Sequence, residues 1–370
     1  MKVRPRAPPN VYGAGPMDGG MRSLPLESAH RLHGAHFGRV ADWRLPLDYG
    51  DAAAEQRAVR TAVGFLDESA KGKVRVEGPD RLAFLDGLLT NDLKALTPGQ
   101  GLYAATLDHK GRVRGDMVVY DVGDHYILGT EPEAGGEVLA YLNSLLVSDD
   151  VTMTDVTEGY GVFGVFGPGS AEVVARVSGV PPPIVPYAYA EGARGSIAVA
   201  RSPAFGGEGY DVWVPAGEAE ATARALLEDA VPFGYTAAEA LRIESGRPKF
   251  PVDMNEETLA LEARLELAIS TTKGCYVGQE IVSRATHIGQ VHRLLIGLEV
   301  DGEPPARGAE VAADGRRVGA VTSAARSASL GKTVALGYVR RENAAPGTRL
   351  TVGGDAAVPA RVAELPFLRP

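Results

Sequence analysis

A short strand pattern, a Gly-Pro stop and a helix pattern follow one another twice in this chain of 370 residues. In the first copy, residues 74–77 alternate apolar and polar, and Gly78-Pro79-Asp80 ends the run and offers Asp80 as a helix N-cap. In the second copy, residues 162–166 form an apolar run, Gly167-Pro168-Gly169 ends it, and residues 171–177 continue as a helix. The repetition predicts two related split βαβ units, an α+β arrangement.

Further strands and a helix are expected after each copy of the pattern. After the first copy we expect strands at 101–107, 113–122 and 125–130 and a helix at 133–146; after the second, strands near 196–201 and 210–214 and a helix at 218–227. From about residue 293 the pattern changes to short β-rich runs at 294–300, 318–322, 333–338, 348–352 and 357–362. Gly, Pro and Asp separate these runs, which favours a small antiparallel barrel or sandwich.

Composition excludes several classes of protein. A net charge of -9 without a long Lys/Arg run disfavours direct nucleic-acid binding. The chain lacks an apolar run of roughly 18 residues, so we expect no membrane-spanning helix. The single cysteine excludes an intrachain disulfide and suits a reducing, cytoplasmic setting. One thiol also cannot build a four-cysteine metal site, so we expect no tightly bound metal within one chain.

The segment Lys273-Gly274-Cys275-Tyr276-Val277-Gly278-Gln279-Glu280 contains that cysteine. Lys273 and the N-terminus of a short helix expected at 278–284 would both favour the thiolate form of Cys275. Gly274 and Gly278 permit close backbone approach, and Gln279 and Glu280 add hydrogen-bonding groups. The alternative is a small structural cysteine in a tight turn. Composition alone leaves both interpretations open.

Two aspartates at strand positions are candidate binding or catalytic groups. Asp116 ends the segment 110–116, a turn that enters a strand, and could accept a hydrogen bond from an amine or carry a proton. Asp211 ends the glycine-rich segment 205–211 and could accept a pair of hydrogen bonds from a heterocycle. The alternatives are a solvated strand-end aspartate and an ordinary hairpin loop.

These segments together resemble a known family. The stretch Lys273 to Glu280 is similar to the KGCYxGQE motif of the YgfZ family of folate-binding proteins, a sister of the glycine-cleavage T-protein, an aminomethyltransferase. The resemblance covers nearly the whole chain from about residue 30. It includes residues 45–50, Glu55, Arg60, 76–80, 89–92, 206–215, 241–246, 321–323, 337–339 and 365–367.

The resemblance implies a three-domain cloverleaf with a central folate channel, in which the two split βαβ (ferredoxin-like) units precede a C-terminal barrel. Asp116 matches the T-protein's catalytic aspartate, Tyr103 a folate-channel tyrosine, and Asp211 the pterin-recognising glutamate, with a shorter arm. Arg242 is a further folate-binding candidate, whereas Ala238 stands where the T-protein has a folate-contacting arginine.

The expected domains are a disordered extension at 1–23, a first α+β domain at 24–60 with 152–250, and a second at 61–151. A motif-bearing connection at 251–285 and a barrel at 286–370 follow.

The resemblance implies a tetrahydrofolate-binding factor that assists assembly or repair of iron–sulfur proteins, including tRNA-modifying enzymes. Its partners would be folate and iron–sulfur client or assembly proteins, with Cys275 acting outward and assisted by Lys273. The competing hypothesis is a tetrahydrofolate-dependent aminomethyltransferase, or one-carbon transferase, of T-protein type, which Asp116 favours. A third is a folate-free scaffold that docks partners.

Overall fold

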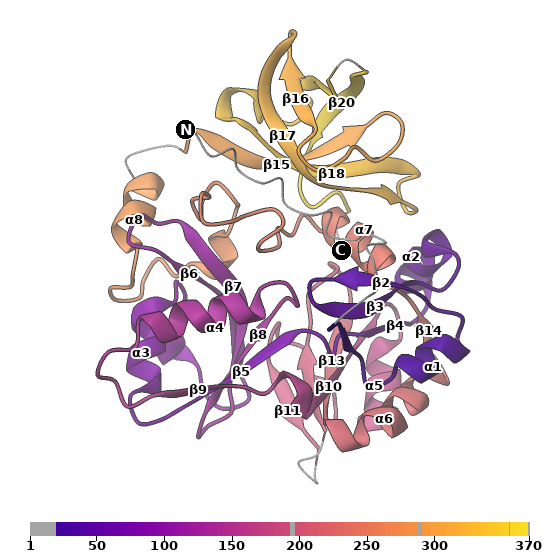
Figure 1. Ribbon diagram of the computed structural model, residues 1–370, viewed down its shortest axis with the longest axis vertical. Helices are drawn as coiled ribbons and strands as arrows, with labels where there is room; N and C mark the ends of the chain where they lie inside the picture. Colours follow the sequence, from indigo (N-terminus) through magenta and orange to yellow (C-terminus); the bar gives the residue numbers. More distant parts are fainter. Residues whose placement is uncertain (1–19, 193–196, 288–290, 355, 369–370) are drawn as a thin grey trace.

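The computed structural model describes residues 20–192, 197–287, 291–354 and 356–368. Two α/β lobes lie side by side, and a β-barrel lies across one end of them (Figure 1). The six strands of the barrel close on themselves, so the C-terminal runs form a barrel and not a sandwich. The predicted α+β cloverleaf with a C-terminal barrel is confirmed.

The strands form three open sheets and the barrel. In spatial order the six-stranded sheet contains β11 (Tyr189–Glu191), β12 (Ala198–Arg201), β13 (Gly209–Pro215), β10 (Tyr160–Phe166), β4 (Gly64–Asp67) and β14 (Val231–Pro232). The five-stranded sheet contains β6 (Gly101–Leu107), β7 (Val113–Asp121), β8 (Tyr126–Thr130), β5 (Gly72–Glu77) and β9 (Thr152–Asp155). A small sheet contains β1 (Arg22–Ser23), β3 (Trp43–Asp48) and β2 (His36–Val40). The barrel contains β15 (Arg293–Val300), β18 (Lys332–Arg340), β17 (Arg316–Ser327), β16 (Glu310–Ala313), β19 (Arg349–Val352) and β20 (Val358–Ala363).

The helices lie on the lobes and in the connections between them. They are α1 (Glu27–Leu32), α2 (Ala52–Thr61), α3 (Arg81–Leu88), α4 (Gly135–Ser144), α5 (Ser170–Ser178), α6 (Ala219–Leu227), α7 (Tyr235–Glu244) and α8 (Gln279–His287). Short 3-10 helices occur at Leu93–Ala95, Thr157–Gly159, Ala216–Glu218, Glu266–Ala268 and Arg341–Asn343. Helix α4 packs on β5 and β7, while α5 and α6 pack on β13 and β10.

The two larger sheets repeat one topology. The five-stranded sheet has the order β6-β7-β8-β5-β9, and the other has the order β11-β12-β13-β10-β4-β14. Adding five to each strand number of the five-stranded sheet gives the order β11-β12-β13-β10-β14. This is the order of the six-stranded sheet, except that β4 lies between β10 and β14. The chain therefore contains the same unit twice, as the repeated sequence pattern predicted.

The two Gly-Pro stops have the same backbone conformation. Gly78 has φ 108° and Gly167 has φ 109°, a region that side chains other than glycine rarely adopt. A Cβ atom at Gly78 would lie 2.1 Å from the Asp150 carbonyl oxygen, and one at Gly167 would lie 2.3 Å from that of Ala62. Both glycines are therefore required by conformation and by space.

Two local expectations need correction. Asp80 does occupy the N-cap position of α3, but its side chain makes no capping bond to that helix. It accepts a hydrogen bond from the Asp150 amide at 2.9 Å and so ties the helix to the start of β9. Residues 1–19 of the expected disordered extension lie outside the described residues, whereas Arg22–Ser23 form β1 and pair with β3. The other domain boundaries stay a prediction. Two strand pairings cross them: β4, in the expected second domain, pairs with β10 of the first, and β9, in the expected first domain, pairs with β5 of the second.

Candidate functional site

A cavity of about 280 Å³ lies between the inner faces of the two larger sheets. Strand register explains which side chains reach it. On one sheet, Tyr103 of β6, Val118 of β7 and Gly129 of β8 lie opposite one another, and Asp116 and Tyr120 share their face. On the other sheet, Leu66, Gly164 and Asp211 lie opposite one another. Gly129, which has no side chain, lines the cavity at the end of the first row.

Tyr103, which is half-buried, and Asp116, which is buried, form a hydrogen-bonded pair on the cavity wall. The Tyr103 hydroxyl donates to Asp116 Oδ2 at 2.7 Å, while Asp116 Oδ1 is buried without a hydrogen-bond partner among the described residues. Burial raises the pKa of Asp116 to about 7; the Tyr103 hydrogen bond opposes this, and the charge of Glu131 adds to it. Near neutral pH, Asp116 can therefore both accept and donate a proton.

The opposite wall also presents polar atoms without partners. Asp211 Oδ1, Glu68 Oε2 and Trp213 Nε1 are buried and make no hydrogen bond within the described part of the chain. All three residues line the cavity. Buried polar atoms are rarely left without partners, so their concentration in one cavity indicates a polar ligand.

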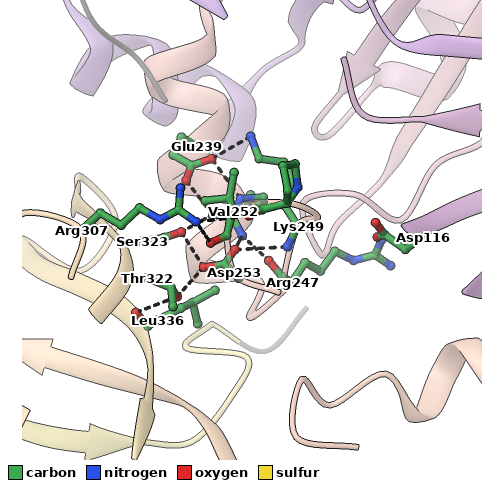
Figure 2. Close-up of polar contacts among 12 residues, drawn as sticks. Asp116, Glu239, Arg247, Lys249, Val252, Asp253, Arg307, Thr322, Ser323 and Leu336 are labelled. Atoms are coloured by element: carbon green, nitrogen blue, oxygen red, sulfur yellow. Dashed lines mark hydrogen bonds and ion pairs between the residues drawn. The ribbon is translucent and has the colours of Figure 1, made fainter. Parts of the chain in front are cut away.

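Helix α7 and the connection that follows it close the cavity on the barrel side. Arg242 Nη1 donates to Asp253 Oδ2 at 2.7 Å, and Nη2 donates to Ser323 Oγ at 2.9 Å. Figure 2 shows Asp253 against Thr322 and Ser323 of the barrel. The guanidinium of Arg242 thus joins α7 to the connection and to the barrel. The contact of Arg242 with folate stays a prediction.

Arg247 supplies a second guanidinium to the cavity. It donates to the Tyr187 hydroxyl at 3.3 Å, and the Tyr187 ring stacks on Tyr103 with centroids 6.5 Å apart. Figure 2 shows its side chain reaching toward Asp116. Ala238, which stands at the position where the T-protein has an arginine, lines the same cavity. Sequence reasoning missed Arg247 because no local spacing distinguished it.

The cysteine motif lies apart from this cavity. Cys275 is exposed, and no residue of Lys273 to Glu280 lines the cavity. The ammonium of Lys273 is buried, donates to the carbonyl oxygens of Asp86, Leu89 and Asn91, and pairs with Asp86 Oδ1 at 3.1 Å. These contacts direct the charge of Lys273 to the end of α3.

The other motif residues pack on the same lobe. The Val277 amide donates to the Gly87 carbonyl oxygen at 3.0 Å. Tyr276 is buried in the hydrophobic core of that lobe, and Gln279 and Glu280 begin α8. Gly278 has φ 84°. A Cβ atom at this glycine would lie 2.6 Å from the Asp108 carbonyl oxygen.

The described residues contain no group of three or more His, Cys, Asp or Glu side chains that could hold a metal ion. None of the helices in this part of the chain is long and apolar enough to cross a membrane.

Two related α/β units that enclose a polar cavity, followed by a closed barrel, define a tripartite class of protein. The chain belongs to the glycine cleavage T-protein family: the GCVT N-terminal domain matches residues 26–273, and the glycine cleavage T-protein C-terminal barrel domain matches residues 293–368.

Several relatives that match this chain over most of its length are aminomethyltransferases. An aminomethyltransferase of Rubrobacter xylanophilus is 33% identical over 363 residues, which cover 95% of each chain. One of Saccharopolyspora erythraea is 32% identical over 362 residues, covering 94% of this chain and 98% of the relative. The crystal structure of the glycine cleavage system aminomethyltransferase T from Bartonella henselae superposes with a TM-score of 0.87 at 26% identity, covering 94% of this chain and 98% of that one.

These findings correct the leading functional prediction. An iron–sulfur assembly or repair factor of YgfZ type was expected from the cysteine motif, but the relatives that match this chain over almost its full length are aminomethyltransferases. The prediction was wrong because eight residues were weighted above the rest of the chain. The T-protein superfamily, the other part of that prediction, is confirmed.

Proposed function

We propose that this protein is a tetrahydrofolate-dependent aminomethyltransferase, or a close one-carbon transferase, whose active site is the cavity between the two sheets. The observation that carries the proposal is the Tyr103–Asp116 pair on the cavity wall, with a carboxyl pKa of about 7 and Asp116 Oδ1 without a hydrogen-bond partner among the described residues. The names of relatives that match 94–95% of the chain support the same activity.

The chemistry requires a group that exchanges protons near neutral pH. Transfer of a carbon from an aminomethyl donor to the two N–H groups of tetrahydrofolate releases ammonia and the donor's carrier. The two protons that leave the folate nitrogens end on these two products. Asp116 can accept one proton and return it, because its pKa lies close to the working pH. Tyr103 holds the carboxyl group in place through its hydroxyl.

The residues present suit a pteridine with a carboxylate tail. Asp211 presents a free carboxylate oxygen to the amino and ring N–H groups of such a heterocycle. Arg247 supplies a guanidinium cation to the cavity wall, and this cation suits the anionic carboxylate tail of the folate. Ala238, on the same wall, provides no such cation. Arg242 would act through the position of α7, since its guanidinium is bonded to Asp253 and Ser323.

Calorimetric titration of the full chain with tetrahydrofolate tests binding, and incubation with tetrahydrofolate and an aminomethyl donor tests transfer. We expect binding, and formation of methylene-tetrahydrofolate that is lost in Asp116→Asn. Asp121→Asn is the matched control, because Asp121 is a buried aspartate of the same strand that does not line the cavity. Absence of tetrahydrofolate binding by the wild-type protein would overturn the proposal and favour a folate-free scaffold.

A further inference from the structure

Glu68 is a buried carboxyl group on the cavity wall that none of the sequence patterns distinguished. It follows directly after β4, lines the cavity, and is 3% exposed. Its Oε1 pairs with the Lys71 ammonium at 2.7 Å, while its Oε2 has no hydrogen-bond partner among the described residues. One oxygen is therefore fixed by the protein and the other is available to a ligand.

Strand register places Glu68 beside Asp211. Gly164 of β10 lies directly opposite Asp211 of β13, and opposed Cβ atoms in such a pair are roughly 5 Å apart. A Cβ atom at Gly164 would lie 3.0 Å from Glu68 Oε2. The carboxyl group of Glu68 thus occupies the space that a side chain at position 164 would fill, next to Asp211. Such a Cβ atom would lie closer still, 2.4 Å, to Phe166 Cε2, so the glycine leaves room on this wall for both the Phe166 ring and the Glu68 carboxyl group.

The ammonium group of Lys71 stabilises the two neighbouring carboxyl groups of Glu68 and Asp211. Burial acts to lower the pKa of Lys71, but the carboxylates of Glu68 and Asp211 outweigh burial and raise it, so the ammonium stays charged. Burial, and the nearby Asp211 and Glu131, raise the pKa of Glu68 against the opposing effect of Lys71. An isolated buried carboxyl pair would be costly, and the lysine offsets part of that cost.

We propose that Glu68 is a specificity-determining residue that, together with Asp211, binds the edge of a heterocycle carrying at least two neighbouring N–H donors. Glu68 Oε2 and Asp211 Oδ1 accept from these donors, and Trp213 Nε1 donates to an acceptor of the same ring. Lys71 is a positioning residue that holds Glu68. This inference rests on the proposed function, in which the heterocycle is the amino-oxo-pyrimidine ring of tetrahydrofolate.

The two carboxyl groups also act against the wrong ligand. A ring without the amino group would leave a buried carboxyl oxygen without a partner, and an unsatisfied buried acceptor is unfavourable. We therefore expect the protein to prefer tetrahydrofolate over its 2-desamino analogue by roughly 10- to 100-fold.

The test is calorimetric titration of the full chain and its variants with both ligands. Glu68→Ala removes the carboxyl group. Glu68→Gln keeps one oxygen for Lys71 and replaces the other by an NH₂ group, which then faces the N–H donors of the ligand. Both variants should lose most of the preference for tetrahydrofolate. Glu55→Gln is the matched control, because Glu55 is a buried carboxylate outside the cavity that accepts from the Tyr49 and Gly234 amides.

The outcomes separate the two proposals. Failure of the wild-type protein to bind tetrahydrofolate overturns the proposed function. Normal wild-type binding, with the same ligand preference in Glu68→Ala, Glu68→Gln and Glu55→Gln, overturns only the role of Glu68. Thermal unfolding checks that the variants are folded. If both neutral variants unfold, Glu68→Asp, which withdraws the carboxyl group by one methylene, is titrated instead, and an unchanged preference again refutes the inference.

Discussion

The raised pKa of Asp116 makes the stability of the protein depend on pH in a direction that can be calculated. The ordinary value for this side chain is 3.8, and burial raises the pKa to about 7. Between these two values the folded state binds more protons than the unfolded state, so stability falls as pH rises. The loss is complete above about pH 7, where both states carry the carboxylate.

The magnitude follows from the two pKa values. At 1.36 kcal/mol for each tenfold change in proton concentration, the titration of Asp116 alone lowers the free energy of unfolding by roughly 2–3 kcal/mol between pH 5 and pH 8. Asp116→Asn removes this titration and keeps an oxygen that can accept from Tyr103. The variant should therefore gain roughly 2–3 kcal/mol relative to the wild-type protein over that interval.

Urea unfolding at pH 5, 6, 7 and 8 measures this difference. Other titrating groups, such as Glu68 and Lys73, cancel when each variant is compared with the wild-type protein at the same pH. Asp121→Asn serves as the control for replacing a buried aspartate of the same strand. A difference between Asp116→Asn and wild type that stays constant within about 0.5 kcal/mol from pH 5 to pH 8 would refute the raised pKa and the role built on it.

Three further results are expected. Tyr103→Phe removes the hydrogen bond that lowers the pKa of Asp116, so the pH profile of transfer should move to higher pH; an unmoved profile contradicts the pairing. Cys275→Ala should leave transfer unchanged because Cys275 lies outside the cavity, although a thiol reagent should modify the wild-type residue readily. Lys273→Met should lower the free energy of unfolding by about 3 kcal/mol in urea, since it leaves Asp86 and three carbonyl oxygens without their partner; a loss below about 1 kcal/mol would argue against this contribution.

Elements with a clear local pattern could be predicted from the sequence. Residues 101–107 coincide with β6, and the five β-rich runs after residue 293 correspond to five of the six barrel strands. Helix α7 could not be recognised, because residues on all sides of it are buried and leave no amphipathic stripe. Strand β4 is only four residues long and wholly buried, so it has no alternating pattern.

The candidate site shows the same limit. Asp116 and Asp211 stand out in the sequence because each follows a glycine-containing turn into a strand. Glu68 and Arg247 do not, because their proximity to these aspartates depends on which strands pair and on how the two sheets face each other. Register between β10 and β13 brings Glu68 to Asp211, and no spacing along the chain encodes that distance.

The cysteine motif supports the site from outside the cavity. Lys273 binds the carbonyl oxygens at the end of α3 and in the loop that follows it, where a cation also interacts favourably with the helix dipole. Gly278 fits closely against the turn between β6 and β7, where a Cβ atom would meet the Asp108 carbonyl oxygen. That hairpin carries Tyr103 and Asp116. The segment that most distinguishes the sequence thus packs against the hairpin of the proposed catalytic pair without lining the cavity.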